Sequence, residues 1–463
     1  MAIIYDLFYA MALHREDLIM RRVLYTGAAL GLCLSAWAPA ARAASPAQQQ
    51  RASSGCTATG TVSYMFWGDK GEDIEQTAVI KQAEAACPGL HVNALWDQGS
   101  YDADLATKIG SGNAPDVFQL DGSKRLPEYV SQGALKDITP YIQKDGLNLK
   151  STFWPACLPE TQYQGKTYGM ERDCGNQGML IYNKDMFDAR HVSYPTSSWT
   201  YKDLQTAAAK ISGNYSLPTD SSAKLRFGIG IQTDDYRMQQ YMWDWGGDWL
   251  STNLKSCTIT SAQSKAGLEW WHNLAFKYHG APTGLQQKVV GDPVSGFQTQ
   301  RYAMAFVGPW ALNYLVKPSA YLSGNAVKFK WGVAANPYGP VSRAALVSTG
   351  EEVMSSHTKN PAAAYQVMKY VTTGTSTKLL AHYGIGIPGN VAASTTSAFT
   401  DEYAPYTQTW LQGIKDGRTP RLIPQYDKFN DAVTTAFKTY WTGQTTIDSA
   451  ASTACNNVKS LLP

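Results

Sequence analysis

The order of hydrophobic and polar positions predicts that strands and helices alternate in the first part of the chain. Apolar runs rich in β-branched and aromatic residues are separated by stretches that favour helices. This βαβαβ order is typical of an α/β fold, in which a parallel sheet carries helices on its faces. The predicted elements are a strand at 61–67, a helix ending near 86, a strand at 91–96, a helix at 102–109 and a strand at 115–120.

Three later helices are expected to begin at residues that suit a helix start. Thr200 is the expected N-cap of a helix at 203–211, and Ser261 is the expected N-cap of another. Asn360 and Pro361 open a third helix, because a proline at the first helical position loses no hydrogen bond. No linker-like composition separates these elements, which indicates that any lobes are joined by more than one chain crossing.

The N-terminal region is expected to be a targeting signal that is removed on export. Met20, Arg21 and Arg22 form a positive region, an apolar run follows, and residues 41–43 supply an Ala-x-Ala cleavage site. This pattern assigns residues 1–43 to a leader and signal peptide. The mature protein is therefore expected in the periplasm or outside the cell.

Two details refine this prediction. The acidic residues Asp6, Glu16 and Asp17 suit no targeting signal, so the first residues are interpreted as an over-extended start. A lipoprotein anchor at Cys33 is disfavoured, because Leu32 is a poor residue before a lipid-carrying cysteine. No other segment approaches the roughly 20 apolar residues that a transmembrane helix needs.

The composition is that of a soluble globular chain of two or three domains. Of the 463 residues, 44% are hydrophobic and 17% are charged, which excludes a polytopic membrane protein and a disordered tail protein. The 40 basic and 37 acidic residues leave a formal charge of +3 without a basic block, so no nucleic-acid partner is expected. Most of the 14 tryptophans and 27 tyrosines belong in cores, but their abundance hints at a sugar-like ligand.

Six cysteines follow the expected signal peptide, and export favours disulfides. Six cysteines can pair in fifteen ways, and free buried thiols remain an alternative. One pair is expected at the same edge of the first sheet, a second flanks an expected hairpin, and the third follows by elimination. The predicted pairs are Cys56–Cys87, Cys157–Cys174 and Cys257–Cys455. Scattered histidines and the lack of a Cys-x-x-Cys motif argue against a metal site, and no cofactor is expected.

Six short motifs occur in a fixed order from about residue 59 onward. They are Trp67-Gly-Asp-Lys-Gly71, Ser111-Gly-Asn-Ala-Pro-Asp116, Leu180-Ile-Tyr-Asn-Lys-Asp185, Ser198-Trp-Thr-Tyr-Lys-Asp-Leu204, Gly308-Pro-Trp310 and Ile423-Pro-Gln425. This order resembles that of the extracellular solute-binding proteins of sugar ABC importers, and the maltose-binding-protein-like group has the most similar pattern. The resemblance covers nearly all of the chain that follows the signal.

The resemblance implies a two-lobe periplasmic-binding-protein-like fold with the ligand in the cleft between the lobes. It implies a protein that binds a sugar or oligosaccharide and delivers it to a membrane ABC permease, without catalysis. A monomer is expected. The expected lobes are residues 56–170 plus 332–384, and residues 171–331 plus 385–463, with the second crossing at 329–333.

Two alternatives remain open: a secreted glycoside hydrolase, and a solute-binding protein for a non-sugar ligand such as a phosphorylated compound or a peptide. A glycosidase needs two carboxylates about 5–9.5 Å apart across a sugar ring. The acidic pairs that could supply them are Glu171 with Asp173, Asp234 with Asp235, and Glu351 with Glu352. Acidic residues are equally expected around a sugar that is only bound.

The first group of candidate ligand residues follows strands of the first lobe, since the carboxyl ends of parallel strands present binding groups. Asp69 and Lys70 match the family's ligand loop, although a helix N-cap beside a solvated lysine is the alternative interpretation. Trp67 is expected either in the cleft or in the core. Asp121 follows the third strand, where the family has a ligand carboxylate; an Asx turn is the alternative.

The second group lies where the resemblance places the second lobe. Asn176 takes the place of a family acid that binds sugar hydroxyls, and loop filler is the alternative. Asp234 and Tyr236 match a sugar-binding acid and a stacking tyrosine. Trp245 is expected to face the cleft, whereas the neighbouring Trp243 is expected in the core.

Trp310 is the strongest candidate, because the family places a sugar-stacking tryptophan in the Gly-Pro-Trp motif, with a core tryptophan as the alternative. Glu351 is expected in a loop after a strand, lining the cleft or exposed in a turn. Where the family's maltose binder has a further stacking tryptophan, this chain has Asn430, and Tyr426 is a possible replacement ring. The aromatic rim expected after Asp116 is also absent, so a different or shorter sugar than maltose is predicted.

Overall fold

The predicted βαβαβ unit supplies the first three strands of a five-stranded sheet with the order β2–β1–β3–β14–β6, in which β2 is an edge strand. The computed structural model describes residues 56–233, 236–311, 315, 327–374, 377–382, 385–396, 399 and 406–463. Strand β1 pairs in parallel with β2 and β3, whereas β14 is antiparallel to both β3 and β6. The strands are β1 (Gly60–Trp67), β2 (Leu90–Asp97), β3 (Val117–Asp121), β6 (Gly169–Glu171) and β14 (Gly350–Met354).

Both faces of β1 are covered, which explains its unbroken apolar run. Val62, Tyr64 and Phe66 pack on one face with helices α2 (Lys70–Ala86) and α14 (Pro361–Thr373). Met65 and Trp67 belong to a separate cluster on the other face, with helices α3 (Tyr101–Gly110) and α4 (Gly122–Ser131). The alternation follows from the two-residue period of a strand.

A second five-stranded sheet has the order β12–β8–β11–β10–β9. Its core is rich in aromatic side chains, and Trp243, Trp249 and Trp271 are almost completely buried in it. The apolar residues 303–307 lie in the middle strand of this sheet. The strands are β8 (Met179–Asn183), β9 (Gly213–Leu217), β10 (Asp220–Ile229), β11 (Tyr302–Val307) and β12 (Trp331–Ala334).

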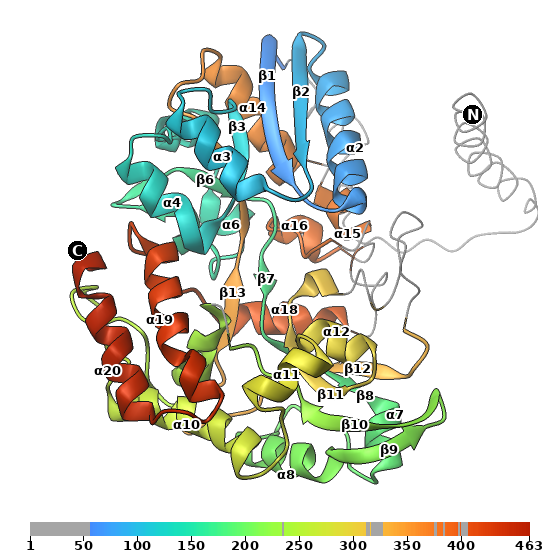
Figure 1. Cartoon of the computed structure of the whole chain (residues 1–463). Coiled ribbons are helices and arrows are strands. Elements are labelled where there is room, and N and C mark those ends of the chain that lie inside the picture. The colour runs from blue at the N-terminus through green and yellow to red at the C-terminus, as the bar shows by residue number, and fades with distance from the viewer. Residues whose placement is uncertain are drawn as a thin grey trace, which may run out of the picture. The chain divides into compact units, whose positions relative to one another are not determined.

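Two short strands, β7 (Gly175–Asn176) and β13 (Ala345–Ser348), run between the two five-stranded sheets and pair with each other (Figure 1). Strand β15 (Gly417–Arg418) pairs with β13. The expected second crossing at 329–333 falls instead within the second sheet, because β12 pairs with β8. The chain reaches the first sheet again only after β13, at β14. The lobe boundaries themselves stay a prediction.

The expected helix starts are found. Thr200 and Asp203 form a capping box at the start of α8 (Tyr201–Ile211), and Ser261 caps α10 (Ala262–Phe276). The expected proline also stands at the start of α14. The remaining helices are α5 (Thr139–Asp145), α6 (Leu149–Thr152), α7 (Lys184–Ala189), α9 (Gln240–Trp243), α11 (Gly284–Val290), α12 (Pro293–Gln298), α15 (Thr377–His382), α16 (Val391–Ser394), α18 (Thr407–Lys415), α19 (Tyr426–Trp441) and α20 (Ile447–Asn457).

Six cysteines are paired in three disulfides, and the pairs are those expected from the sequence: Cys56–Cys87, Cys157–Cys174 and Cys257–Cys455. The second pair flanks the expected hairpin, formed by β4 (Gln162–Tyr163) and β5 (Lys166–Thr167). Within the described ranges, no helix has the length and apolarity to cross a membrane. The expected signal peptide lies outside the described residues.

Candidate functional site

Two of the predicted ligand residues, Asp69 and Lys70, stand between the end of β1 and the first turn of α2. Asp69 caps α2, with its Oδ1 accepting hydrogen bonds from the backbone N–H groups of Gly71 (2.7 Å) and Glu72 (3.2 Å). Lys70 is exposed, and its Nζ lies 5.0 Å from the centre of the Trp96 ring. This arrangement agrees with the alternative interpretation, in which Asp69 is a helix N-cap beside a solvated lysine. A contact of Asp69 or Lys70 with a ligand stays a prediction.

Trp67 and Asp121 stand at the adjacent ends of β1 and β3. Trp67 is half-buried and packs edge-on against Tyr101, with ring centres 5.2 Å apart. Asp121 is half-buried, and its Oδ1 accepts a hydrogen bond from Ser348 Oγ at 3.3 Å. Because Ser348 ends the crossing strand β13, Asp121 is held next to the place where the chain passes between the two sheets.

Glu351 does not lie in a loop but inside β14, between β3 and β6. Its side chain is fully buried, and both carboxylate oxygens lack a hydrogen-bond partner among the described residues. Burial, together with the neighbouring acids Glu160, Asp121 and Glu171, raises the pKa of Glu351 well above its usual value. The prediction that Glu351 stands in a loop, lining the cleft or exposed, is therefore wrong, because Glu351 is buried inside a strand.

The positive charge of the buried Arg172 offsets part of the negative charge of the buried acids. The Arg172 guanidinium is 2% exposed and lies 3.3 Å from Glu75 and 3.5 Å from Glu72. Tyr64 donates a hydrogen bond to Glu352 at 2.8 Å. Burial nevertheless raises the pKa of Glu75 and of Glu352 to about 7, although Arg172 acts in the opposite direction.

Trp310 follows β11 in a short 3-10 helix (Pro309–Ala311), as the Gly-Pro-Trp motif predicts. Its ring is half-buried, and its Nε1 donates a hydrogen bond to Gln177 Oε1 at 2.9 Å. A Cβ atom on Gly308 would collide with both partners, so only glycine fits before this pair. Gln177 is a residue that sequence reasoning missed, because its link to Trp310 joins positions far apart in the chain.

Asn176, next to Gln177, is completely buried in β7. Its Oδ1 accepts a hydrogen bond from the backbone N–H of Gly178 at 2.9 Å. Its side chain lines a cavity beside α18 that contains none of the other predicted ligand residues. Trp245, with which Asn176 was grouped, does not line this cavity.

The remaining candidates are distributed differently from expectation. Trp245 is half-buried in an aromatic cluster, 4.7 Å from the Tyr201 ring centre and 5.7 Å from that of Trp270. Tyr426 is almost completely buried in the second core, and its hydroxyl accepts a hydrogen bond from Gln239. The burial of Tyr426 does not fit a replacement for a stacking tryptophan. The cleft-facing position of Trp245 stays a prediction.

Asp234 lies outside the described residues, and so does the side chain of Tyr236; only the Tyr236 backbone is described, at the start of a 3-10 helix (Tyr236–Gln239). Their expected roles stay predictions.

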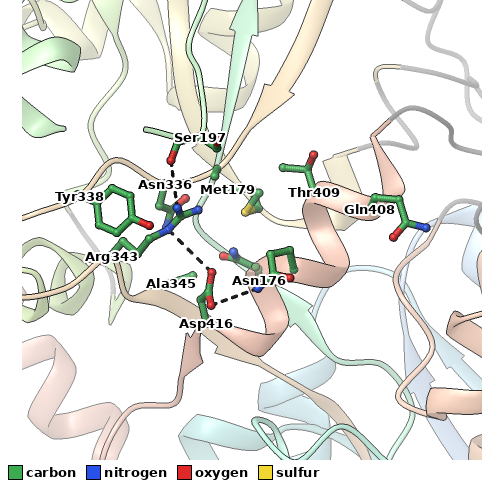
Figure 2. Close-up of a pocket in the computed structure, with 13 residues that line it drawn as sticks. Asn176, Met179, Ser197, Asn336, Tyr338, Arg343, Ala345, Gln408, Thr409 and Asp416 are labelled. Atoms are coloured by element: carbon green, nitrogen blue, oxygen red, sulfur yellow. Dashed lines mark hydrogen bonds and ion pairs between the residues drawn. The ribbon is translucent and has the colours of Figure 1, made fainter. Parts of the chain in front are cut away.

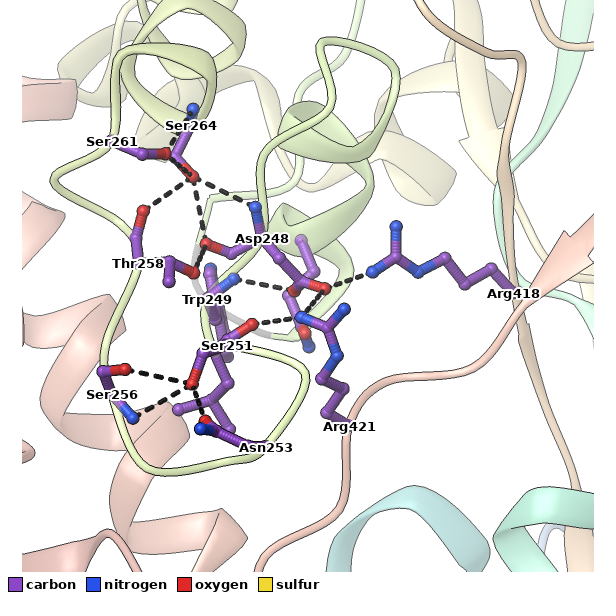
Figure 3. Close-up of polar contacts among 12 residues, drawn as sticks. Asp248, Trp249, Ser251, Asn253, Ser256, Thr258, Ser261, Ser264, Arg418 and Arg421 are labelled. Atoms are coloured by element: carbon purple, nitrogen blue, oxygen red, sulfur yellow. Dashed lines mark hydrogen bonds and ion pairs between the residues drawn. The ribbon is translucent and has the colours of Figure 1, made fainter.

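Ion pairs fix the segment that leads to α19. Asp248 is 7% exposed and pairs with Arg418 and with Arg421, the latter at 2.7 Å (Figure 3). The Arg421 guanidinium also donates to the carbonyl of Leu250. These contacts hold the chain just before the Ile-Pro-Gln motif.

No group of three or more His, Cys, Asp or Glu side chains in the described ranges is arranged to hold a metal ion. The half-buried aromatic and carboxylate groups at the ends of β1, β3 and β11 are suited to hydrogen bonding and to covering apolar ligand faces.

Three kinds of comparison agree with this architecture. A family model described as bacterial extracellular solute-binding protein matches residues 69–375. A binding protein of Brucella abortus is 23% identical over 393 residues, which cover 83% of this chain and 89% of the relative.

Two solved structures are similar in fold. The ABC substrate-binding protein from Listeria monocytogenes in complex with cycloalternan is 22% identical, with a TM-score of 0.74 and coverage of 87% of this chain and 99% of that chain. A solute-binding protein from Thermotoga lettingae bound with α-D-tagatose is 21% identical, with a TM-score of 0.70 and coverage of 87% and 100%. The fold is therefore that of two-lobe solute-binding proteins. Because the family model matches well over half of the chain, the protein belongs to the bacterial extracellular solute-binding proteins.

Proposed function

We propose that this protein is an exported binding protein for a sugar or short oligosaccharide and that it delivers its ligand to a membrane ABC permease. The observation that carries the proposal is Trp310, a half-buried ring at the end of β11 whose edge nitrogen is fixed by Gln177. A fixed, half-buried indole ring is suited to cover the C–H face of a sugar ring. In this proposal the protein acts as a monomer in the periplasm or outside the cell.

The ligands of the two solved structures support a carbohydrate over other solutes. One of them binds α-D-tagatose and the other cycloalternan. Asp69 and Asp121 at the ends of β1 and β3 would accept hydrogen bonds from sugar hydroxyls. The absence of a tryptophan at Asn430 and the burial of Tyr426 favour a ligand of few rings.

The glycoside hydrolase alternative loses support from the burial of its candidate acids. Glu171, Glu351 and Glu352 are each fully buried, so neither the Glu171–Asp173 pair nor the Glu351–Glu352 pair can flank a sugar ring in this conformation. The pair Asp234 and Asp235 lies outside the described residues. An assay for new reducing ends after incubation with oligosaccharides tests this alternative.

A thermal-shift screen against mono- and oligosaccharides, phosphorylated sugars and peptides tests the proposed ligand class. A ligand at 100-fold above its Kd should raise the free energy of unfolding by about 2.7 kcal/mol. Sugars that raise the melting temperature of the wild type more than that of Trp310→Ala support the proposal. Stabilisation by peptides or phosphorylated compounds alone would contradict it.

A further inference from the structure

A cavity of about 500 Å³ lies beside the crossing strands, and its volume is in the range of small-molecule sites (Figure 2). It is enclosed by β7, β13, α18 and the loop that follows β12. Its polar lining consists mainly of neutral amide and hydroxyl side chains: Asn176, Ser197, Asn336, Gln408, Thr409 and Gln412.

Two buried amides in this lining each have one unused polar atom. Asn176 is 0% exposed and Asn336 is 4% exposed. The backbone N–H of Gly178 binds Asn176 Oδ1, and Asn336 Nδ2 donates to the Ala344 carbonyl at 3.3 Å, so both amide orientations are fixed. The donor Asn176 Nδ2 and the acceptor Asn336 Oδ1 find no partner among the described residues.

Such unused atoms point to a partner that enters the cavity. An unsatisfied buried donor or acceptor costs about 1–3 kcal/mol, so a molecule that pairs with both atoms would remove this cost. A molecule that both accepts and donates hydrogen bonds would satisfy the two atoms together. A hydroxyl group does both.

The charges in the lining balance each other. The Arg343 guanidinium lies 3.8 Å from an Asp416 oxygen, and Arg343 Nη1 also donates to the Ser197 carbonyl at 3.2 Å. The guanidinium carbon is 4.7 Å from the centre of the Tyr338 ring, which is 47% exposed. Because the only charged pair in the lining is internally matched, the cavity favours a neutral ligand.

We propose that this cavity is a second binding site, for a small neutral polyhydroxylated molecule such as a monosaccharide or polyol. Neither Trp310 nor Gln177 lines it, so it is distinct from the proposed Trp310 site. Asn176, which lines the cavity, is the last residue of β7. The next residue, Gln177, which accepts the hydrogen bond of Trp310, lies in the turn that follows the strand.

The test uses the full mature protein with Trp310→Ala as the background, so that the site at the strand ends is weakened. D-glucose, D-galactose, D-mannitol and myo-inositol are the probes, and binding is measured by calorimetry and by saturation-transfer NMR. In this background, Gln412→Trp should fill the cavity from the exposed side of α18 and lower probe affinity by about tenfold or more. Asn336→Leu should do the same by removing the unused acceptor.

Lys415→Trp is the matched control, because Lys415 is exposed on the same helix and does not line the cavity. It should leave probe binding unchanged, and melting temperatures check that each variant folds. Loss of all probe binding in Trp310→Ala alone, or equal binding by the Gln412→Trp and Lys415→Trp variants, would overturn the second site. Unchanged sugar affinity in Trp310→Ala would instead contradict the role of Trp310 and leave the cavity proposal standing.

Discussion

Trp310 is the residue at which loss of ligand affinity can be told apart from loss of stability. Its ring is half-buried, so Trp310→Ala should remove stacking contacts without opening a large core cavity. Truncation of such a ring should cost at least about 2 kcal/mol of binding, or roughly 30-fold in Kd. Calorimetric titration with the sugar found by the thermal-shift screen measures this loss.

A core tryptophan provides the control for this prediction. Trp271 is 0% exposed, so Trp271→Ala should lower the free energy of unfolding by about 3–5 kcal/mol. Trp310→Phe keeps a ring but loses the donor to Gln177, and it should fall between wild type and Trp310→Ala in affinity. If Trp310→Ala kept its affinity and lost as much stability as Trp271→Ala, Trp310 would belong to the core.

The buried acids beside Arg172 predict a specific pH dependence of stability. Burial raises the pKa of Glu75 and Glu352 from 4.5 to about 7 in the folded protein. Between these pH values the folded state holds more protons than the unfolded state, so this contribution to stability is full below pH 4.5 and is lost as the pH rises to about 7. Glu352→Gln should remove its share of this slope.

The measurement is denaturant unfolding of wild type and Glu352→Gln at pH values from 4.5 to 7.5, compared as a difference between the two proteins. The stability of the variant relative to wild type should increase as the pH rises, because its side chain does not ionise. Glu128→Gln, at a partly exposed position on α4, is the control and should leave the slope unchanged. A constant difference between Glu352→Gln and wild type would show that Glu352 titrates normally.

Packing between elements depends on glycine where α8 crosses β10. A Cβ atom on Gly228 would collide with the Ala208 backbone, which cannot move without shifting the helix. Gly228→Ala should therefore lower the free energy of unfolding by about 1–3 kcal/mol through overpacking. Gly110→Ala is the matched control, because nothing lies within 4 Å of its Cβ position at the end of α3. Chemical denaturation of both variants tests the prediction, and equal stabilities would contradict it.

The starts of helices could be predicted where the capping residues lie within a few positions of each other in the sequence. Thr200 and Asp203 cap each other across one helical turn, and this short range makes the start of α8 visible in the sequence. Glu351 and Glu352 show where a local pattern misleads, since two charged residues in succession suggest an exposed loop but form part of a buried strand. The partners of Glu352 are Tyr64 and Arg172, which reach this place only through the fold.

At the scale of the whole molecule, the sequence predicted the parallel βαβ unit better than the return of the chain to it. Strands β1, β2 and β3 are neighbours in the sequence and in the sheet. Strand β14 inserts between β3 and β6 from much further along the chain, and no local pattern marks that pairing. For the same reason, the contact of Gln177 with Trp310 could not be predicted from the sequence. Nor could the cavity beside α18, whose lining comes from four distant segments.

The disulfide with the longest span should contribute most to global stability. Cys257 and Cys455 are 198 residues apart and join the loop before α10 to α20, whereas Cys56 and Cys87 are 31 apart. Because loop-closure entropy grows with span, replacing Cys257 and Cys455 by alanine should lower the free energy of unfolding by about 2–4 kcal/mol. Urea unfolding without reductant measures this loss, and a steeper dependence on urea is expected because the unfolded chain expands. Sugar affinity should be unchanged, since neither cysteine is among the proposed ligand residues. Unchanged unfolding, or free thiols at these positions in non-reducing peptide mapping of the wild type, would contradict the bond.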